Sequence, residues 1–372
     1  PLPSSPKASD AENLLKVLSG VIKPNMSLVN ATTGETVRIG KLLKLTGKKQ
    51  EEISEALAGD IAAVTKLEAS TNDTLCAPEA VAALAPTEFP QACYFRAVNL
   101  AGGGDEGKLS GAIRRLLEED PTLKYVHNHE THQRMIGGLG DQHLDVAAAK
   151  LKSKFGMEVK MSEPKIAYRE AIRKPVTIES KYKKQSGGHG QYGHVKIEFE
   201  PYDGDELMFC EKVFGGAVPK NFFPAVEKGL QEAAEHGSIG GFPVVRLKAT
   251  LIDGSYHPVD SSEMAFKTAA SMAFKDCMKE AQPYLLEPVD SLKILLPDDK
   301  QGDVMSVLSK RRGSVLGMNS VGGGMTELLA EAPEAELGDF ALTLRQITQG
   351  LGEFTSEFAR YDMLPPGTEI KS

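Results

Sequence analysis

One order of apolar patterns occurs twice in this sequence, and it restricts the possible folds more than any other feature. Between residues 89 and 161, short runs with strand character and amphipathic helical stretches follow each other in the order β-α-β-β-α-β. The same order returns between residues 291 and 358, although the two stretches share little sequence. This order is the plan of the ferredoxin-like, or split βαβ, fold. We therefore expect two ferredoxin-like domains.

The remaining stretches have different patterns. Residues 14–76 alternate apolar and polar residues in short runs separated by turn residues, which predicts a small β-barrel. The middle of the chain combines long strands with a helix after Ser261 and Ser262, which can cap it, and the first turns of this helix are apolar on most sides. The sequence therefore predicts a multidomain α+β chain with a distinct middle domain.

The expected domain boundaries follow the changes in pattern. We predict a linker or truncated end at 1–13, a partial β-barrel domain at 14–86, a ferredoxin-like domain at 87–164, the middle domain at 165–288, a second ferredoxin-like domain at 289–365 and a tail at 366–372.

Composition excludes several classes of protein. No apolar run approaches the roughly 20 residues that span a bilayer, so we expect no membrane association. The four cysteines form no CxxC pair, which is typical of buried thiols in a reducing cytoplasm. A formal net charge of −8 argues against general coating of nucleic acid but allows local basic patches.

Two basic patches stand out, and each also has a simpler interpretation as a solvated surface. Lys181, Lys183 and Lys184 precede a glycine-rich loop. Lys310, Arg311 and Arg312 end a predicted helix, where cations also complement the helix dipole.

Nucleotide-binding motifs are absent or out of context. No segment matches GxxxxGK[ST], so the sequence contains no P-loop. Residues 188–193 match GxGxxG, but a polar stretch precedes them and a strand follows, whereas dinucleotide binding requires a strand before the loop and a helix after it. We favour an exposed glycine loop, in which His189 and Tyr192 could stack on bases.

Two further stretches contain groups that could carry chemistry. His127, His129 and His132 resemble a metal cluster, but a polar hairpin is the simpler interpretation, and we expect no metal site. Residues 253–263 form a connecting loop, in which His257 could act as a general base oriented by Asp260 or Glu263. Turn residues and a helix cap explain the same loop, and its exposed polar side chains also suit contact with RNA.

From about Leu14 to Leu364, and most clearly in the glycine loop and in the loop that contains His257, the sequence resembles bacterial elongation factor G. The resemblance rests on several motifs in one order. They are 51–63, LLEEDP at 116–121, GLGDQHLD at 138–145, QSGGHGQYGHV at 185–195, DGSYHPVDSSEMAFK at 253–267, 311–313 and 348–350. His189 and Asp141 depart from the usual arginine and glutamate of the family.

The resemblance implies a domain plan and a set of contacts. The β-barrel corresponds to the second domain, the ferredoxin-like domains to the third and fifth, and the middle domain to a fourth that is similar to ribosomal protein S5. In this family the tip of the fourth domain enters the A site of the small ribosomal subunit. The resemblance assigns that tip to Gly188, His189, Gly190, Gln191, Tyr192 and Gly193, and to Ser255, Tyr256, His257, Asp260 and Ser261. It assigns contact with large-subunit rRNA to Lys310, Arg311 and Arg312.

The resemblance also implies partners and activity. We expect a cytoplasmic monomer that contacts the ribosome and the tRNA–mRNA complex and promotes translocation. GTP and Mg²⁺ are expected to bind a GTPase domain that this sequence does not contain, and no residue present is expected to be catalytic. The alternative is a stand-alone or divergent ribosome-binding paralogue that acts in recycling, protection or inhibition without its own GTPase.

Overall fold

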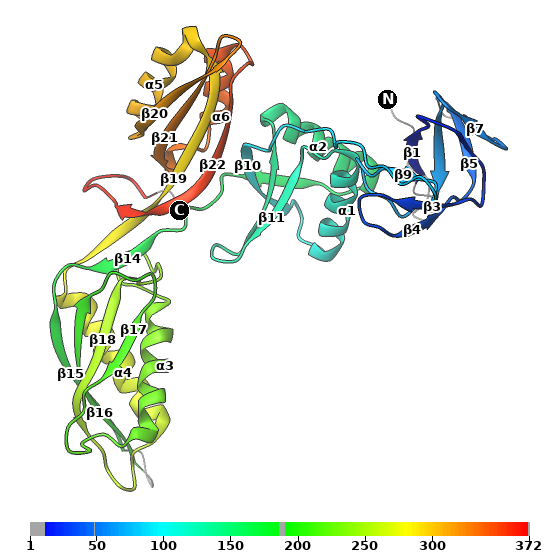
Figure 1. The fold of residues 1–372 in the computed structure, drawn as a ribbon. Helices are drawn as coiled ribbons and strands as arrows, with labels where there is room; N and C mark the ends of the chain where they lie inside the picture. The colour runs from blue at the N-terminus through cyan, green and yellow to red at the C-terminus, as the bar shows by residue number, and fades with distance from the viewer. Residues whose placement is uncertain (1–11, 48, 186–189, 371–372) are drawn as a thin grey trace. The chain divides into compact units, whose positions relative to one another are not determined.

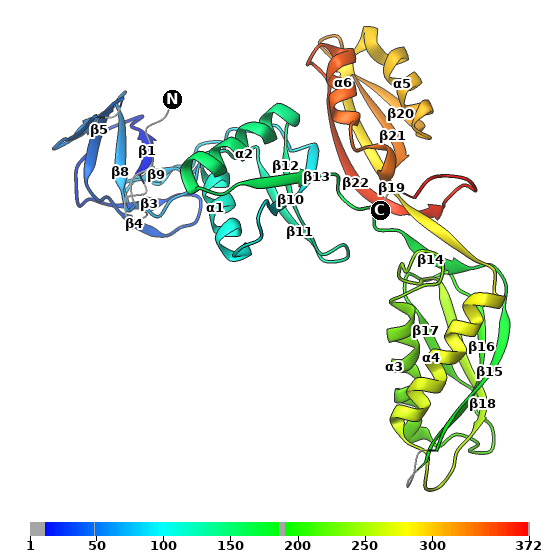
Figure 2. The same cartoon turned by 180° about the vertical axis from the view of Figure 1, so that it is seen from behind.

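The computed structural model describes residues 12–47, 49–185 and 190–370 (Figures 1 and 2). The chain divides into two compact units, of which the first comprises residues 1–128 and 134–163 and the second comprises 129–133 and 164–372. None of the helices in the described ranges has the length and apolar character that a membrane-spanning segment needs.

Short strands at the start of the first unit form a small β-barrel. These strands are β1 (Glu12–Lys16), β2 (Val21–Ile22), β3 (Ser27–Asn30), β4 (Thr36–Arg38), β5 (Leu42–Thr46), β6 (Lys49–Glu52), β7 (Ala56–Leu57), β8 (Ile61–Thr65) and β9 (Leu75–Cys76). They pair in the orders β1-β8-β5-β6, β4-β3-β9 and β2-β7. Val17, Ile39 and Leu42 are buried in its interior. The predicted barrel is therefore present.

The rest of the first unit has the predicted ferredoxin-like order. It contains β10 (Tyr94–Leu100), α1 (Glu106–Glu119), β11 (Lys124–Asn128), β12 (Gln133–Gly138), α2 (Asp141–Phe155) and β13 (Val159–Ser162). The sheet order is β11-β12-β10-β13. Asp105 caps α1 by accepting hydrogen bonds from the amides of Gly107 and Lys108, and Gly156 ends α2 with φ 67°.

The middle module lies in the second unit and consists of a four-stranded sheet and two long helices. Its elements are β15 (Val176–Lys184), β16 (Gln191–Pro201), β17 (Met208–Glu211), the 3₁₀ turn η1 (Lys220–Phe222), α3 (Phe223–Ala234), β18 (Leu247–Ser255) and α4 (Glu263–Glu280). The sheet order is β15-β16-β18-β17. Phe199, Phe266 and Phe274 are buried where α4 packs on the sheet. The predicted cap of α4 is present, since Ser262 accepts a hydrogen bond from the amide of Ala265 at 3.2 Å.

The C-terminal module repeats the ferredoxin-like order with longer strands. It contains β19 (Pro283–Pro297), η2 (Asp298–Lys300), α5 (Gln301–Lys310), β20 (Ser314–Gly322), β21 (Met325–Pro333), η3 (Glu334–Glu336), α6 (Phe340–Thr348) and β22 (Glu353–Met363). Its sheet has the order β14-β19-β21-β20, with β22 also paired to β19, and β14 is Arg169–Ile172.

Strand β19 connects the middle and C-terminal modules without a break. The boundary expected between residues 288 and 289 falls inside this strand, and β14, from the expected middle domain, pairs with its first half. Pro288 and the charged Glu287 resemble a strand end in the sequence. Glu287 can nevertheless occupy a buried position because Arg312, distant in the sequence, forms an ion pair with it.

Two carboxyl groups, those of Asp290 on β19 and Glu334 in η3, have raised pKa values. Burial, and next the charge of Asp290, raise the pKa of Glu334 from 4.5 to about 7. Burial also raises the pKa of Asp290. Because the folded state holds these protons more tightly, the stabilisation is present at pH values below the unfolded pKa and is lost as the pH rises through about 7.

We therefore expect the free energy of unfolding of the second unit to fall between about pH 5 and pH 8. Urea titrations at several pH values measure this fall, and Glu334→Gln should make it shallower. An equal slope in the variant and the unaltered chain would contradict the assignment to Glu334.

Candidate functional site

Two segments that are distant in the sequence meet at one end of the middle module, where the β15–β16 hairpin turns (Figure 1). The amide of Tyr192 donates to the carbonyl oxygen of Asp260 at 2.8 Å, and the hydroxyl of Ser261 donates to the carbonyl oxygen of Tyr192 at 3.0 Å. The amide of Gly190 donates to the Asp260 carboxylate at 3.0 Å. We call residues 190–193 and 255–261 the tip. These bonds join the end of a hairpin to the loop before α4.

Glycine at position 193 permits this close approach. A Cβ atom there would lie 2.4 Å from the carbonyl oxygen of Ala265 and 2.8 Å from the amide nitrogen of Phe266, both in the first turn of α4. Because these are backbone atoms, no side-chain rotation could relieve the clash. The glycine is therefore required by packing between strand and helix.

The loop that contains His257 is held by its own hydrogen bonds. The amide of His257 donates to the Ser261 hydroxyl at 2.8 Å, and the amide of Ser261 donates to the His257 carbonyl oxygen at 3.1 Å. The amides of Val259 and Asp260 donate to Nδ1 of His257 at 3.3 and 3.1 Å. These bonds order the loop without help from a partner.

The same bonds determine which nitrogen of the His257 imidazole can donate a hydrogen bond. Because Nδ1 accepts two amide bonds, the neutral ring carries its proton on Nε2, and the side chain is 51% exposed. The Asp260 carboxylate already accepts from Gly190 and lies 3.4 Å from Nδ1. This geometry suits an outward hydrogen-bond donor and disfavours the general-base interpretation.

Beneath the loop, a chain of hydrogen bonds connects three strands. The Tyr192 and Ser255 hydroxyls are 2.7 Å apart, and Ser255 Oγ is 2.7 Å from Nδ1 of His194. Nε2 of His194 is 2.9 Å from the carboxylate of Glu179 on β15. The hydrogen bond with Ser255, followed by interaction with Lys181 (Nζ 5.2 Å from the ring centroid), lowers the pKa of Tyr192.

Sequence reasoning did not identify His194 or Glu179 as part of this site. Tyr192 and His194 are two positions apart on a strand and therefore point to the same face. That spacing was a usable signal for His194. Glu179 could not be found this way, because its proximity depends on the register of the hairpin.

The other predicted tip residues have different surroundings. The Gln191 side-chain oxygen accepts a hydrogen bond from the Tyr182 hydroxyl at 3.1 Å, and Tyr256 is 48% exposed. Gly188 and His189 lie outside the described residues. The contacts between the two predicted segments are thus made by Gly190 and Tyr192 on one side and by Ser255, Asp260 and Ser261 on the other.

The predicted basic patch at the end of α5 is less available than its sequence suggests. Arg311 donates to the Asp339 carboxylate at 2.6 Å, and Arg312 forms ion pairs with the carboxylates of Glu287 and Glu336. The hydrogen bond with Glu287 raises the pKa of Arg312. Only Lys310 of the three is exposed, so the patch offers one accessible cation.

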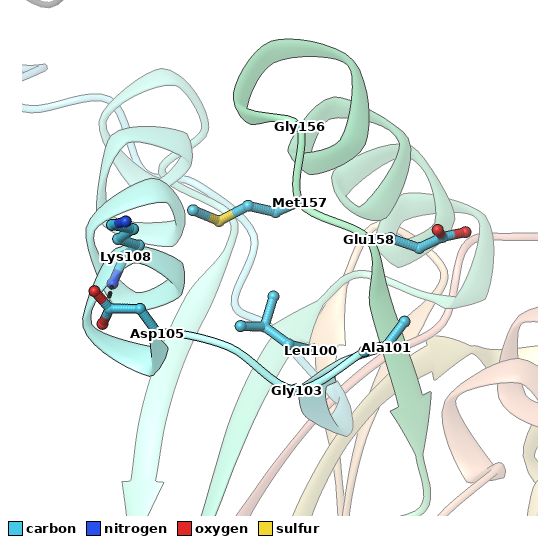
Figure 3. A pocket seen from close by; sticks show the side chains of 9 residues that line it. Leu100, Ala101, Gly103, Asp105, Lys108, Gly156, Met157 and Glu158 are labelled. Atoms are coloured by element: carbon cyan, nitrogen blue, oxygen red, sulfur yellow. Dashed lines mark hydrogen bonds between the residues drawn. The ribbon is translucent and has the colours of Figure 1, made fainter.

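Two other kinds of ligand site, a cavity and a metal centre, are less well supported than the tip. A cavity of about 370 Å³ lies beside the glycine-rich turn between β10 and α1. Figure 3 shows residues that line it, among them Leu100, Gly103 and Met157. The Asp105 carboxylate already occupies the amides at the start of α1, which disfavours a bound anion. Within the described ranges, no three His, Cys, Asp or Glu side chains gather as metal ligands.

Comparison with known families agrees with this architecture. Four family models match successive stretches: elongation factor Tu domain 2 at 14–76, elongation factor G domain III at 89–163, elongation factor G domain IV at 164–282 and the elongation factor G C-terminus at 284–369. The domains are therefore those of a translation elongation factor. The chain belongs to the elongation factor G family.

Individual relatives are similar over nearly the whole chain. An elongation factor G-like protein of Thermotoga maritima is 41% identical over 358 residues, which cover 96% of this chain and 52% of that protein. A crystal structure of a Thermus thermophilus protein superimposes with a TM-score of 0.77 at 40% identity and covers 95% of this chain and 53% of the other. The chain thus spans about half the length of these relatives.

Proposed function

We propose that this chain is the ribosome-binding part of an elongation factor G-type translation factor that promotes movement of tRNA and mRNA. The observation that carries the proposal is the tip, in which two distant segments are bonded into one ordered end that presents His257 and Tyr256 to solvent. The tip acts by shape and by hydrogen bonding to RNA, with no covalent step. Its proposed target is the decoding-side A site of the small subunit.

The remaining modules are proposed to connect the tip to a GTPase domain. We propose that GTP and Mg²⁺ bind a GTPase domain of the same protein and that its nucleotide state is passed on through the ferredoxin-like domain at 89–163. The C-terminal module is proposed to contact large-subunit rRNA through Lys310, while Arg311 and Arg312 maintain its fold. The factor is proposed to be a cytoplasmic monomer.

Ribosome pelleting with the purified chain tests the role of the tip. We expect the unaltered chain to pellet with ribosomes, and more strongly at low salt because phosphate contacts release counterions. We expect His257→Ala to weaken binding about fivefold, which corresponds to the loss of one hydrogen bond of about 1 kcal/mol.

The matched control is His236→Ala, which removes an exposed histidine just after α3, away from the tip. It should bind as the unaltered chain does. If the unaltered chain fails to pellet even at low salt, the proposed function is wrong. If both variants lose affinity equally, His257 has no specific role.

A further inference from the structure

The loop between β17 and α3, residues 212–219, presents an aromatic side chain almost entirely to solvent. Phe214 is 94% exposed, whereas the preceding Val213 packs against the core. Gly215 and Gly216 follow it with φ values of 66° and 72°, a backbone conformation that side chains disfavour. Exposure of a lone phenylalanine ring has a cost in water, and nothing in the packing of this module uses the ring.

This loop lies at the same end of the module as the tip. β17 runs parallel to β18, so both strands lead toward that end, and the amide of Lys212 donates to the carbonyl oxygen of Leu251 at 2.8 Å. Val218 is buried against Gly254. A Cβ atom added to Gly254 would lie 2.6 Å from a methyl group of Val218. Gly254 immediately precedes Ser255 of the tip, so the loop and the tip are neighbours.

The beginning of α3 holds the other end of the loop. Phe222 stacks on Phe266 of α4, with ring centroids 4.6 Å apart. Because Val213 packs against the core before Phe214, and Val218 and Phe222 are anchored after it, the loop is attached to the core on both sides of a short exposed turn. Phe214 is thus carried on a supported turn.

Two exposed cations lie close to Phe214 in the sequence. Lys212 precedes it by two residues, Lys220 follows it by six, and both are exposed. An aromatic ring between cations is the arrangement by which proteins hold single-stranded nucleic acid, with stacking on a base and attraction of its phosphates. Phe214 is the only large exposed apolar residue of the fully described loop 212–219, and Tyr256 and Val259 are exposed at the neighbouring tip. An apolar pocket on a protein partner is therefore the alternative that the leucine variant described below tests.

We propose that Phe214 is a third contact point beside the tip and stacks on an unpaired base of RNA, with Lys212 and Lys220 attracting the neighbouring phosphates. This inference rests on the proposed function, because it requires the tip to approach RNA. It adds a recognition element that the glycine loop and the His257 loop do not contain.

A fluorescent reporter can be introduced without interference, because the chain contains no tryptophan. In Phe214→Trp, titration with a single-stranded RNA oligonucleotide, which contains no tryptophan, should quench the single tryptophan as it stacks on a base. The matched control is Tyr202→Trp, which places a tryptophan at a 40% exposed aromatic position just beyond the opposite end of β16. Its emission should not change.

Binding measurements separate stacking from simple apolar contact. Stacking on one base is worth about 1–3 kcal/mol, so Phe214→Ala should weaken ribosome binding by roughly fivefold to a hundredfold. Phe214→Tyr should retain affinity, and Phe214→Leu should not, because leucine has no π-face. Equal thermal midpoints of all variants would show that the fold is unchanged, as expected for so exposed a residue.

The outcomes distinguish the two proposals. If the unaltered chain does not bind ribosomes, the proposed function fails. If it binds and Phe214→Ala binds equally well, only the stacking inference fails. If Phe214→Leu binds as well as the unaltered chain, the ring enters a protein pocket and the inference of a nucleobase is overturned.

Discussion

Gly193→Ala is expected to destabilise the middle module by about 3 kcal/mol, the upper part of the range for overpacking a tight interior. The added methyl group would lie 2.4 Å from the backbone oxygen of Ala265, so either β16 or the first turn of α4 must move. Either movement strains the bond between Ser261 and Tyr192 that holds the tip together. Urea unfolding measures the stability, and ribosome pelleting should show at least a tenfold loss of affinity.

A second glycine-to-alanine substitution serves as the matched control. Gly317 lies in strand β20, and a Cβ there would have no atom within 4 Å. Gly317→Ala should change the free energy of unfolding by less than about 1 kcal/mol and leave ribosome binding unaltered. If both variants lose similar stability, the contact between Gly193 and α4 is not what constrains this position.

Arg312→Ala should have the largest effect on the C-terminal module, a loss of about 3–5 kcal/mol of unfolding free energy. The Glu287 side chain is only 3% exposed, and Arg312 donates to both of its carboxylate oxygens. Removing the guanidinium leaves a buried carboxylate without its counter-ion. Denaturant titration of the unaltered chain and the variant measures this loss.

Two comparisons test that explanation. Arg360→Ala removes an arginine that is 46% exposed and paired with Glu331 and Asp362, and it should cost about 1 kcal/mol or less. Adding Glu287→Leu to Arg312→Ala removes the unpaired charge and should restore part of the stability. If the double variant is no more stable than Arg312→Ala, the buried charge is not the cause of the loss.

Much of the fold could be predicted from local patterns. The two β-α-β-β-α-β stretches, the barrel and the cap at Ser262 each depend on residues close together in the sequence. Strand β19 was predicted less well, because its middle contains Pro288 and a charge. The charge of Glu287 in this strand is paired with Arg312, which lies 25 residues further along the sequence.

The residues of the candidate site also divide into those indicated by the local sequence and those that depend on strand pairing. The two segments of the tip were singled out by their glycines, histidines and serines and by a family resemblance. The role of His194 depends on the pairing of β16 with β18, and that of Glu179 on the pairing of β15 with β16. In the sequence, nothing separates Phe214 from the other apolar residues. Its exposure in the folded structure distinguishes it.

By itself, the sequence determined which elements form and in what order, because strand and helix periodicity, caps and turn glycines act over a few residues. The tertiary structure decided which polar groups are available. Arg311 and Arg312 form ion pairs within the protein, the imidazole of His257 is half exposed with its Nδ1 already hydrogen-bonded, and Phe214 lies in solvent. The physical reason is that burial and charge pairing depend on neighbours brought together by folding, and local patterns do not contain them.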